Sequence, residues 1–181
     1  RRMAGFRREH PLVRFHIYSA TADEIQERLE KGLLDLGILT EPADIGRYEF
    51  IRLPKRDQWG VWVDREHPLA ARERVTPQDL LGVPLLLPQR ERVQQELAGW
   101  FGDDFEKAEV AATYNLILNA ANMIRNGVGI ALGFLFGNLS DDLRFIPLSP
   151  ALETGSVLVW KKDQAFSPTA AAFLRDLRRA E

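Results

Sequence analysis

The segment RLEKGLLDLGIL, residues 28–39, constrains the fold most, because a charged helical pattern ends at Gly32 and an almost wholly apolar run follows at once. Ile25, Leu29 and Leu33 recur every four residues and form one apolar helical stripe. Glycine suits the left-handed position just past a helix end. Short helix-to-strand connections are usual in α/β folds, and an apolar strand of this kind is typical of a parallel sheet covered on both faces.

The residues before this segment complete a strand–helix–strand unit. Val13–Ala20 (VRFHIYSA) alternates aromatic and polar residues and predicts a strand. Thr21 and Glu24 have the T-x-x-E spacing of a capping box, which predicts a helix start. Gly37, inside the apolar run, predicts a close backbone approach or a bulge. The order strand, helix, glycine, buried strand is that of a βαβ unit.

The same order recurs in the second half of the chain. A strand is expected at Ala108–Thr113, a largely apolar helix at Asn115–Gly127, and a buried strand in VGIALGFL, residues 128–135. Further elements are expected as follows: a short helix at 76–82, a buried strand in VPLLLPQ, a helix at 91–102, strands in LRFIPLSP and SVLVWKKD, and a closing helix at 167–181. Two such units are consistent with two α/β lobes built on one plan.

The composition excludes several functional classes. The chain carries 24 basic and 26 acidic residues, a net charge of −2, whereas a domain that grips nucleic acid along its own surface is usually clearly basic. Its local basic clusters are interpreted as solvated helix faces; they are Arg1, Arg2, Arg7, Arg8 and Arg175, Arg178, Arg179. The absence of cysteine rules out thiol catalysis and zinc–thiolate sites. No run approaches the ~20 apolar residues of a membrane span.

Signals for catalysis are weak. His10, His16 and His67 lack metal-ligand spacing, so we expect structural or surface roles and no metal or cofactor. No phosphate loop, nucleophile elbow or dinucleotide fingerprint occurs. The glycines of NGVGIALG follow a helix and enter a strand, whereas a phosphate cradle runs from strand to helix. We therefore expect a binding domain rather than an enzyme.

Signals for binding lie at two strand-to-helix junctions. YSATADE carries Ser19 and Thr21, and ATYNLI carries Thr113 and Asn115. A helix start presents unpaired N–H groups and a partial positive charge, and ligands of open α/β sheets lie at the carboxyl ends of the strands. These polar side chains could cap the two helices, or they could share the helix donors with an anionic ligand.

Taken in order, these motifs resemble the effector-binding domain of LysR-type transcriptional regulators over essentially the whole chain. The matching stretches are FRREHPLVRFHIYSATADEIQERLEKGLLDLGIL, WGVWVDREHPLA, VTPQDLLGVPLLLP, ATYNLILNAANMIRNGVGIAL and FIPLSP with VLVWKKD and SPTAAAFLRDL. The pattern L-x-x-G-x-L-D-L-G-I, and HPLA followed by T-P-x-D-L, are fairly specific in this order.

The resemblance implies an α/β fold with two lobes of the type II periplasmic-binding-protein kind. Lobe I would comprise residues 1–57 and 162–181, and lobe II residues 58–161. Two crossing strands, Trp59–Val63 and Val157–Trp160, would join them. The family's first strand would precede the printed chain, so lobe I would lack it.

The resemblance also implies a function without catalysis, cofactor or metal. A small-molecule effector, here a small organic anion, would bind between the lobes of a cytoplasmic homodimer or homotetramer that has no membrane contact. DNA would be bound only by a winged helix-turn-helix domain upstream of this chain. The family's binding turns map onto Ser19 and Thr21 in one lobe and onto Thr113, Tyr114 and Asn115 in the other.

Two other readings remain open at the level of sequence. One is a transport-type solute-binding protein of the same fold, for which an export signal rather than a helix-turn-helix would precede the chain. No signal peptide is visible, but the chain begins inside a helical pattern. The other is an α/β enzyme, which would show a turnover that depends on one polar residue at the strand ends.

Overall fold

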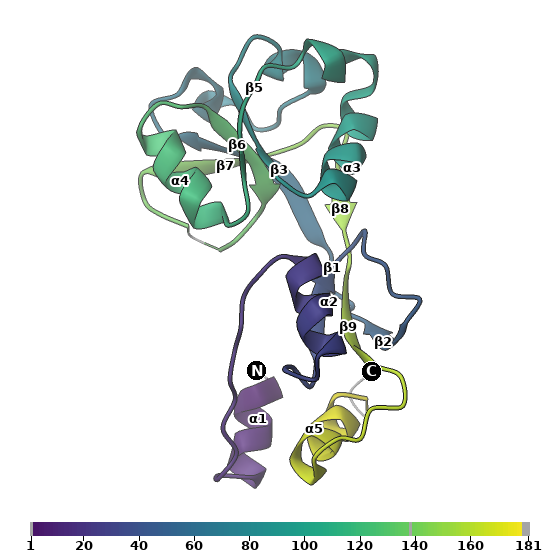
Figure 1. The fold of residues 1–181 in the computed structure, drawn as a ribbon. Coiled ribbons are helices and arrows are strands. Elements are labelled where there is room, and N and C mark those ends of the chain that lie inside the picture. The colour runs from purple at the N-terminus through teal and green to yellow at the C-terminus, as the bar shows by residue number, and fades with distance from the viewer. Residues whose placement is uncertain (1, 138, 179–181) are drawn as a thin grey trace. The chain divides into compact units, whose positions relative to one another are not determined.

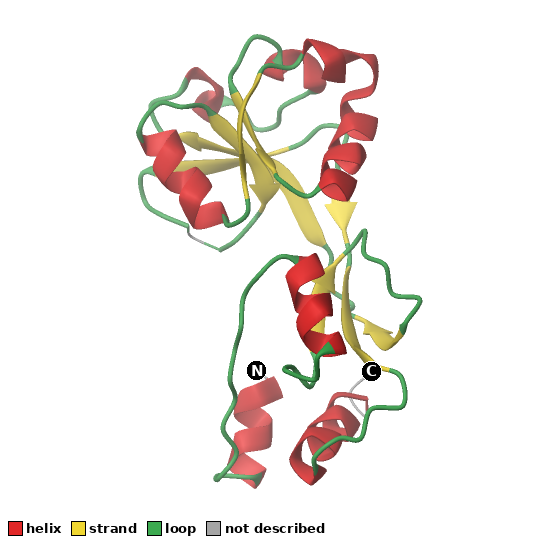
Figure 2. Ribbon diagram, viewed as in Figure 1, coloured by secondary structure: helices red, strands yellow, loops and turns green. Residues whose placement is uncertain are grey.

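The computed structural model describes residues 2–137 and 139–178, and the chain divides into two compact units (Figure 1). Unit 1 comprises Arg1–Leu39, Asp44–Leu53 and Val157–Glu181, and unit 2 comprises Thr40–Ala43 and Pro54–Ser156. Both units combine helices with strands, as Figure 2 shows. The chain therefore has the α/β class that the sequence predicts, and it passes between the units four times.

Unit 1 contains a small sheet and three helices. Its elements are α1 (Arg2–Glu9), α2 (Ala22–Glu30), β1 (Gly37–Thr40), β2 (Tyr48–Arg52), β9 (Ser156–Lys161) and α5 (Pro168–Arg178). The strand order is β1-β9-β2, so the last strand in the sequence lies at the centre. β2 and β9 are antiparallel.

Helix α2 packs closely on the first strand, which explains the glycine inside the apolar run. A Cβ atom on Gly37 would lie 2.8 Å from Cγ2 of Ile25, 3.0 Å from Cδ1 of Leu29 and 3.5 Å from Cγ2 of Val159. Ile25 and Leu29 are both buried. The predicted close backbone approach at Gly37 is confirmed.

Two sequence predictions in unit 1 are wrong. Val13–Ala20 forms no strand with any described residue, and its Ile17 is exposed. The apolar run of residues 33–39 is not covered on both faces, since Leu33 and Ile38 are each 62% exposed. The side chains of β1 alternate between buried and exposed, because α2 covers one face of this strand and the other face is open. At Val13–Ala20, no neighbouring strand among the described residues pairs with the backbone, and an alternating pattern becomes a strand only where such a neighbour exists.

The two terminal helices of unit 1 are joined by aromatic rings. Phe6 of α1 meets Phe173 of α5 edge to face at 5.1 Å between centroids, and Phe15 meets Phe173 at 5.0 Å. α5 begins where the backbone N–H of Ala170 donates to Oγ of Ser167, as the Ser-Pro start predicts. The expected end of this helix at 179–181, like Arg1 and Arg179 of the basic clusters, lies outside the described residues.

Unit 2 is built on a six-stranded sheet with one long helix on each side. Its elements are β3 (Asp57–Asp64), β4 (Leu85–Pro88), α3 (Glu91–Phe101), β5 (Val110–Tyr114), α4 (Ile117–Arg125), β6 (Ile130–Phe134), β7 (Leu143–Pro147), β8 (Glu153–Thr154) and the 3₁₀ segments Pro68–Ala71, Pro77–Leu80 and Gly102–Lys107. The order is β5-β4-β6-β3-β7, and β8 pairs with β3. β4 is parallel to β5 and β6, while β3 is antiparallel to its neighbours.

The inner strands β3, β4 and β6 of the unit 2 sheet are buried on both faces, as the apolar runs predict, whereas the edge strand β5 is mostly exposed. Leu85 and Leu87 of β4 point into the core beneath α3, whereas Leu86, between them, points into the core beneath α4. The period-two alternation of strand side chains places these neighbours on opposite faces. This arrangement fixes the strand ends and the two helix starts that follow them.

Candidate functional site

The carboxyl ends of the parallel strands β4, β5 and β6 meet at one edge of unit 2. Pro88, the last residue of β4, pairs with Tyr114, the last residue of β5, and the N–H of Gln89 donates to the carbonyl of Tyr114 at 2.8 Å. β6 ends at Phe134 on the other side of β4. This edge is where open α/β sheets bind ligands.

Tyr114 fixes the geometry of this edge. Its hydroxyl donates to the carbonyl of Leu132 at 2.6 Å, and its side chain is buried. A Cβ atom on Gly133 would lie 2.9 Å from that hydroxyl and 3.2 Å from Cδ1 of Ile117, so β6 lies close against the start of α4. Burial raises the pKa of the Tyr114 hydroxyl well above its usual value, which keeps it neutral and hydrogen-bonded.

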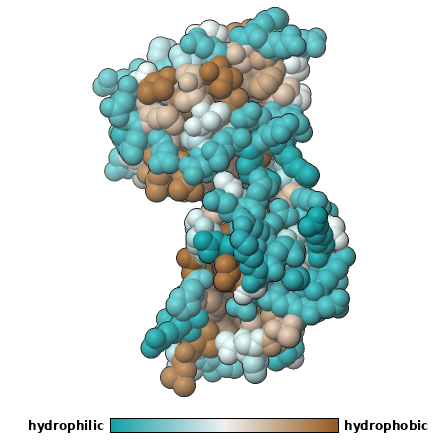
Figure 3. Space-filling model, in the orientation of Figure 1, coloured by the Kyte–Doolittle hydropathy of each residue, from teal (hydrophilic) through white to brown (hydrophobic). Residues whose placement is uncertain are grey.

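Exposed side chains lie at or directly after the ends of β5 and β6. We define the strand-end surface as Thr113, Asn115, Leu116, Leu135 and Phe136. Its three apolar members are 45%, 43% and 48% exposed respectively. Figure 3 shows brown, hydrophobic residues over the part of unit 2 where α4 lies in Figure 1. Exposed apolar side chains that gather in one place mark binding surfaces more often than isolated ones do.

The strand-end surface lies in a stretch of chain with almost no charge. Between residues 110 and 140 the only charged residue is Arg125. Arg125 lies in the last turn of α4, where its Nε donates to Oδ2 of Asp142 at 2.6 Å and its Nη2 to Oδ1 at 3.3 Å. This guanidinium lowers the pKa of the Asp142 carboxyl. The strand-end surface therefore carries no titratable side chain of its own.

The start of α4 carries no side-chain cap. The helix begins at Ile117, and its N-cap residue is Leu116. Of the two alternatives that the sequence left open for Thr113 and Asn115, capping of this helix is not realised, because the helix starts two residues later than the pattern predicted. Oδ1 of Asn115 instead accepts from Nδ2 of Asn119 at 3.2 Å. No acidic residue occupies the first turn of α4, so its partial positive charge is not offset there.

Phe134 connects the strand-end surface to the interior of unit 2. Its ring lies 4.3 Å from that of Trp59 and 6.1 Å from that of Phe136, and its carbonyl accepts from Nε1 of Trp62 at 2.9 Å. Leu116, Leu135 and Phe136 were not among the predicted binding residues. The near absence of charged residues over 110–140, where Arg125 is the one exception, was the signal in the sequence that could have identified them.

The junction in unit 1 has a different chemistry. Thr21 and Glu24 form the predicted capping box: the N–H of Thr21 donates to Oε2 of Glu24 at 2.9 Å, and the N–H of Glu24 donates to Oγ1 of Thr21 at 3.4 Å. Hydrogen bonds from the Thr21 N–H and hydroxyl lower the pKa of the Glu24 carboxyl. The start of α2 is thus capped by an ionised acid, whereas Ser19 is exposed on the preceding extended segment.

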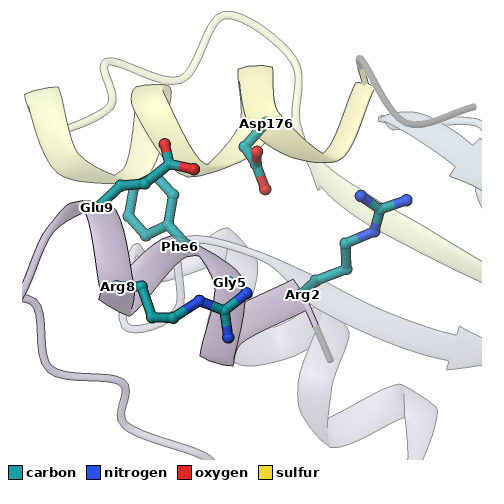
Figure 4. Close-up of a pocket in the computed structure, with 6 residues that line it drawn as sticks. All are labelled: Arg2, Gly5, Phe6, Arg8, Glu9 and Asp176. Atoms are coloured by element: carbon teal, nitrogen blue, oxygen red, sulfur yellow. The ribbon is translucent and has the colours of Figure 1, made fainter.

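A separate cavity of about 470 Å³ lies between α1 and α5 of unit 1 (Figure 4). It is lined by Arg2, Gly5, Phe6, Arg8, Glu9 and Asp176. Its two arginines and two carboxylates balance in charge, and none of the predicted binding residues lines it. The cavity therefore adds no support to a site at either strand-to-helix junction.

The three histidines have different surroundings and share no site. Nδ1 of His67 accepts from the N–H of Leu69 at 3.2 Å and caps a 3₁₀ segment, His10 contacts the ring of Phe6, and His16 is exposed. Among the described residues, no group of three or more histidine, aspartate or glutamate side chains could hold a metal ion. Likewise, no described helix is long and apolar enough to cross a membrane.

The chain thus has an α/β fold in two units, with polar and apolar side chains at the carboxyl ends of parallel strands in unit 2. Comparison with known proteins identifies its family: residues 1–181 match the model of the LysR substrate binding domain. The chain belongs to this family.

Individual relatives agree with this assignment. The uncharacterized HTH-type transcriptional regulator YvbU of Bacillus subtilis is 29% identical over 134 residues, which cover 72% of this chain and 43% of that protein. The effector binding domain of QuiR in complex with shikimate superposes with a TM-score of 0.86 at 17% identity, covering 99% of this chain and 88% of the other. Full-length CbnR complexed with its target DNA superposes with a TM-score of 0.75 at 17% identity, covering 99% of this chain and 64% of the other.

The chain spans about half of the length of the regulators that it matches in sequence, namely 43% of YvbU and 59% of YybE of Bacillus subtilis. These relatives are transcriptional regulators, which favours a regulatory domain over the transport-type alternative. The expected winged helix-turn-helix has no counterpart in the described residues.

Proposed function

We propose that this chain is the ligand-sensing domain of a LysR-type transcriptional regulator and that the strand-end surface of unit 2 contacts its effector. The observation that carries the proposal is the exposed, largely apolar strand-end surface at the carboxyl ends of β5 and β6, none of whose five residues is charged, in a chain of this family. A small molecule that binds one conformer of the domain better shifts the population towards it. That shift would alter how attached DNA-binding domains meet their sites.

The chemistry of the strand-end surface suggests the class of effector. Leu116, Leu135 and Phe136 would cover an apolar ring, and Thr113 and Asn115 offer a hydroxyl and an amide for its polar groups. The start of α4 favours an oxygen that carries negative charge. We infer a small cyclic carboxylate, a narrower class than the small organic anion predicted from the sequence.

The five predicted contacts take different roles in this proposal. Thr113 and Asn115 are proposed direct contacts. Tyr114 is a positioning residue, because its hydroxyl is already bonded to Leu132. Ser19 and Thr21 remain predictions; the hydroxyl of Thr21 already donates to Glu24 at 2.8 Å.

The proposal assigns no catalysis: the hydroxyl of Thr113 is the one nucleophilic group among the five residues of the strand-end surface, and none of these residues is a general base that could activate it. DNA binding would belong to an attached domain, as in the complex of CbnR with its target DNA. We propose a cytoplasmic location and a homodimeric or homotetrameric assembly, as the resemblance to this family implies.

A thermal-shift screen tests the proposal. Benzoate and shikimate would be compared with glucose 6-phosphate and with spermidine, a cation. A ligand at about 100 times its Kd stabilises the fold by about 2.7 kcal/mol, which is a rise of about 5–10 °C in Tm for a domain of this size. We expect such a rise with a cyclic carboxylate, and none with spermidine.

Matched variants locate the binding. Phe136→Ser should abolish the rise, whereas Leu12→Ser, at a 96% exposed residue of unit 1, should leave it intact. A rise that survives Phe136→Ser, Leu135→Ser and Thr113→Val would place the ligand elsewhere. No rise with any cyclic carboxylate would contradict the proposed effector class.

A further inference from the structure

Inside unit 2, a chain of hydrogen bonds ends at the carboxyl group of Glu96, which takes no part in the proposed effector site. Nε1 of Trp59 donates to Oγ1 of Thr154 at 2.7 Å, and that hydroxyl donates to Oε1 of Glu96 at 3.2 Å. The other oxygen, Oε2 of Glu96, is buried and has no hydrogen-bond partner among the described residues. Buried carboxylate oxygens are normally paired, so this one needs a physical account.

The acid lies beside the segments that connect the two units. Thr154 of β8 is two residues before the last residue of unit 2, and the N–H of Glu41, in the connecting segment Thr40–Ala43, donates to the carbonyl of Gly155 at 3.0 Å. Arg56 belongs to the next segment that enters unit 2. Its Nη2 donates to the carbonyl of Glu153 at 2.8 Å, and its Nε lies 3.5 Å from Oε2 of Glu153.

The charged groups around Glu96 do not fully offset the negative charge that its carboxylate would carry. Burial raises the pKa of the Glu96 carboxyl, and the negative charge of Glu41 raises it further. The Thr154 hydroxyl and the positive charge of Arg56 lower it. Arg56 is shared with Glu153, so it neutralises Glu96 only in part. The net direction is upward, which means that the folded chain holds the proton of Glu96 more tightly than an exposed carboxyl does.

We propose that Glu96 is a protonation-dependent clamp on the connecting segments. In its neutral form the acid accepts from Thr154 and holds β8 and the Glu41 segment to α3 without a buried charge. In its ionised form the buried oxygen carries charge with no donor, and water must reach it. The segments around Thr154 then open more often. This inference does not depend on the identity of the effector.

The sign of the effect follows from the direction of the shift. Because the folded pKa lies above the unfolded value, the stabilising contribution is fully present below the unfolded pKa and is lost as pH rises through the folded pKa. Removing the charge by Glu96→Gln should therefore raise Tm at about pH 8, by about 2–4 °C, and leave it unchanged at about pH 4. Hydrogen exchange of the Glu41 and Trp59 amides should slow in the variant at about pH 8.

Three variants separate the clamp from a purely structural role. Glu106→Gln removes an exposed acid and should show no such pH dependence. Thr154→Val removes the hydroxyl that donates to Glu96 and should enlarge the pH-dependent loss of Tm. Thr154→Ser keeps a hydroxyl and should return that loss to its wild-type size. A Tm difference between wild type and Glu96→Gln that is the same at both pH values would overturn the proposal. So would a loss of stability in Glu96→Gln at both.

Discussion

At the scale of single residues, two glycines show how differently the same side chain can be used. A Cβ atom on Gly60 in β3 would lie 2.3 Å from Cζ of Phe145 and 2.4 Å from the carbonyl oxygen of Ile146 in the neighbouring strand. At Gly99 in α3, no atom beyond its chain neighbours and the backbone of its own helix lies within 4 Å of the same position. The first glycine is required for close packing, whereas the second only loosens its helix.

These surroundings predict opposite effects of one substitution. Gly60→Ala should destabilise unit 2 by about 3 kcal/mol or more, because a backbone carbonyl cannot move aside cheaply. Gly99→Ala should stabilise it by about 0.5–1 kcal/mol, because alanine loses less conformational freedom in a helix. Urea denaturation of both variants measures these free energies of unfolding. A Gly60→Ala variant as stable as wild type would show that β7 can shift away.

At the scale of elements, helices α2 and α4 differ at their first turns. α2 has a complete capping box and two acids, Asp23 and Glu24, in its first turn. α4 has the apolar N-cap residue Leu116 and no acid. An aspartate at an N-cap both accepts from backbone N–H groups and offsets the helix dipole.

A pair of cap substitutions tests this difference. Thr21→Ala should cost about 1 kcal/mol of unfolding free energy, and Leu116→Asp should add about 1 kcal/mol. The second change should also weaken binding of a carboxylate effector, because it places a negative charge at the strand-end surface. If Leu116→Asp stabilised the domain and left effector binding unchanged, the effector would not contact the start of α4.

Elements with a strong local pattern were the ones that could be predicted. The capping box at Thr21 and the buried strand in VPLLLPQ were both predicted correctly, the first from its residue spacing and the second from its apolar run. The prediction of a strand at Val13–Ala20 was wrong, because a strand also needs a distant partner that the local pattern does not reveal. The strand-end surface was predicted only at its polar residues. Phe136 reaches it through the pairing of β6 with β4, which no local pattern encodes.

At the scale of the whole molecule, each unit has its own core. Leu158, Trp160 and Leu174 form a cluster within unit 1, while the sheet of unit 2 carries a cluster on each face. β9 supplies two of the three residues of the first cluster and lies between β1 and β2. Unit 1 therefore depends on β9 more than on any other strand.

This dependence predicts a selective loss of structure. Val159→Asp places a charge at a fully buried position of β9 and should unfold unit 1, while unit 2 keeps its protection. Hydrogen exchange should show fast amides in β1 and β2 and slow amides in β4 and β6. Ile38→Asp, at an exposed position of β1, is the control and should change little. Fast exchange throughout the chain would show that the two units unfold together.

The position of β9 has a consequence for how the chain is made. During synthesis from the N-terminus, β1 and β2 emerge more than a hundred residues before the strand that must lie between them. Unit 2 draws on a nearly continuous stretch, Pro54–Ser156, and has all of its strands before β9 leaves the ribosome. Domains generally fold as their chain emerges. We therefore expect the second unit to form first, and the first to be completed only when Val157–Glu181 arrives.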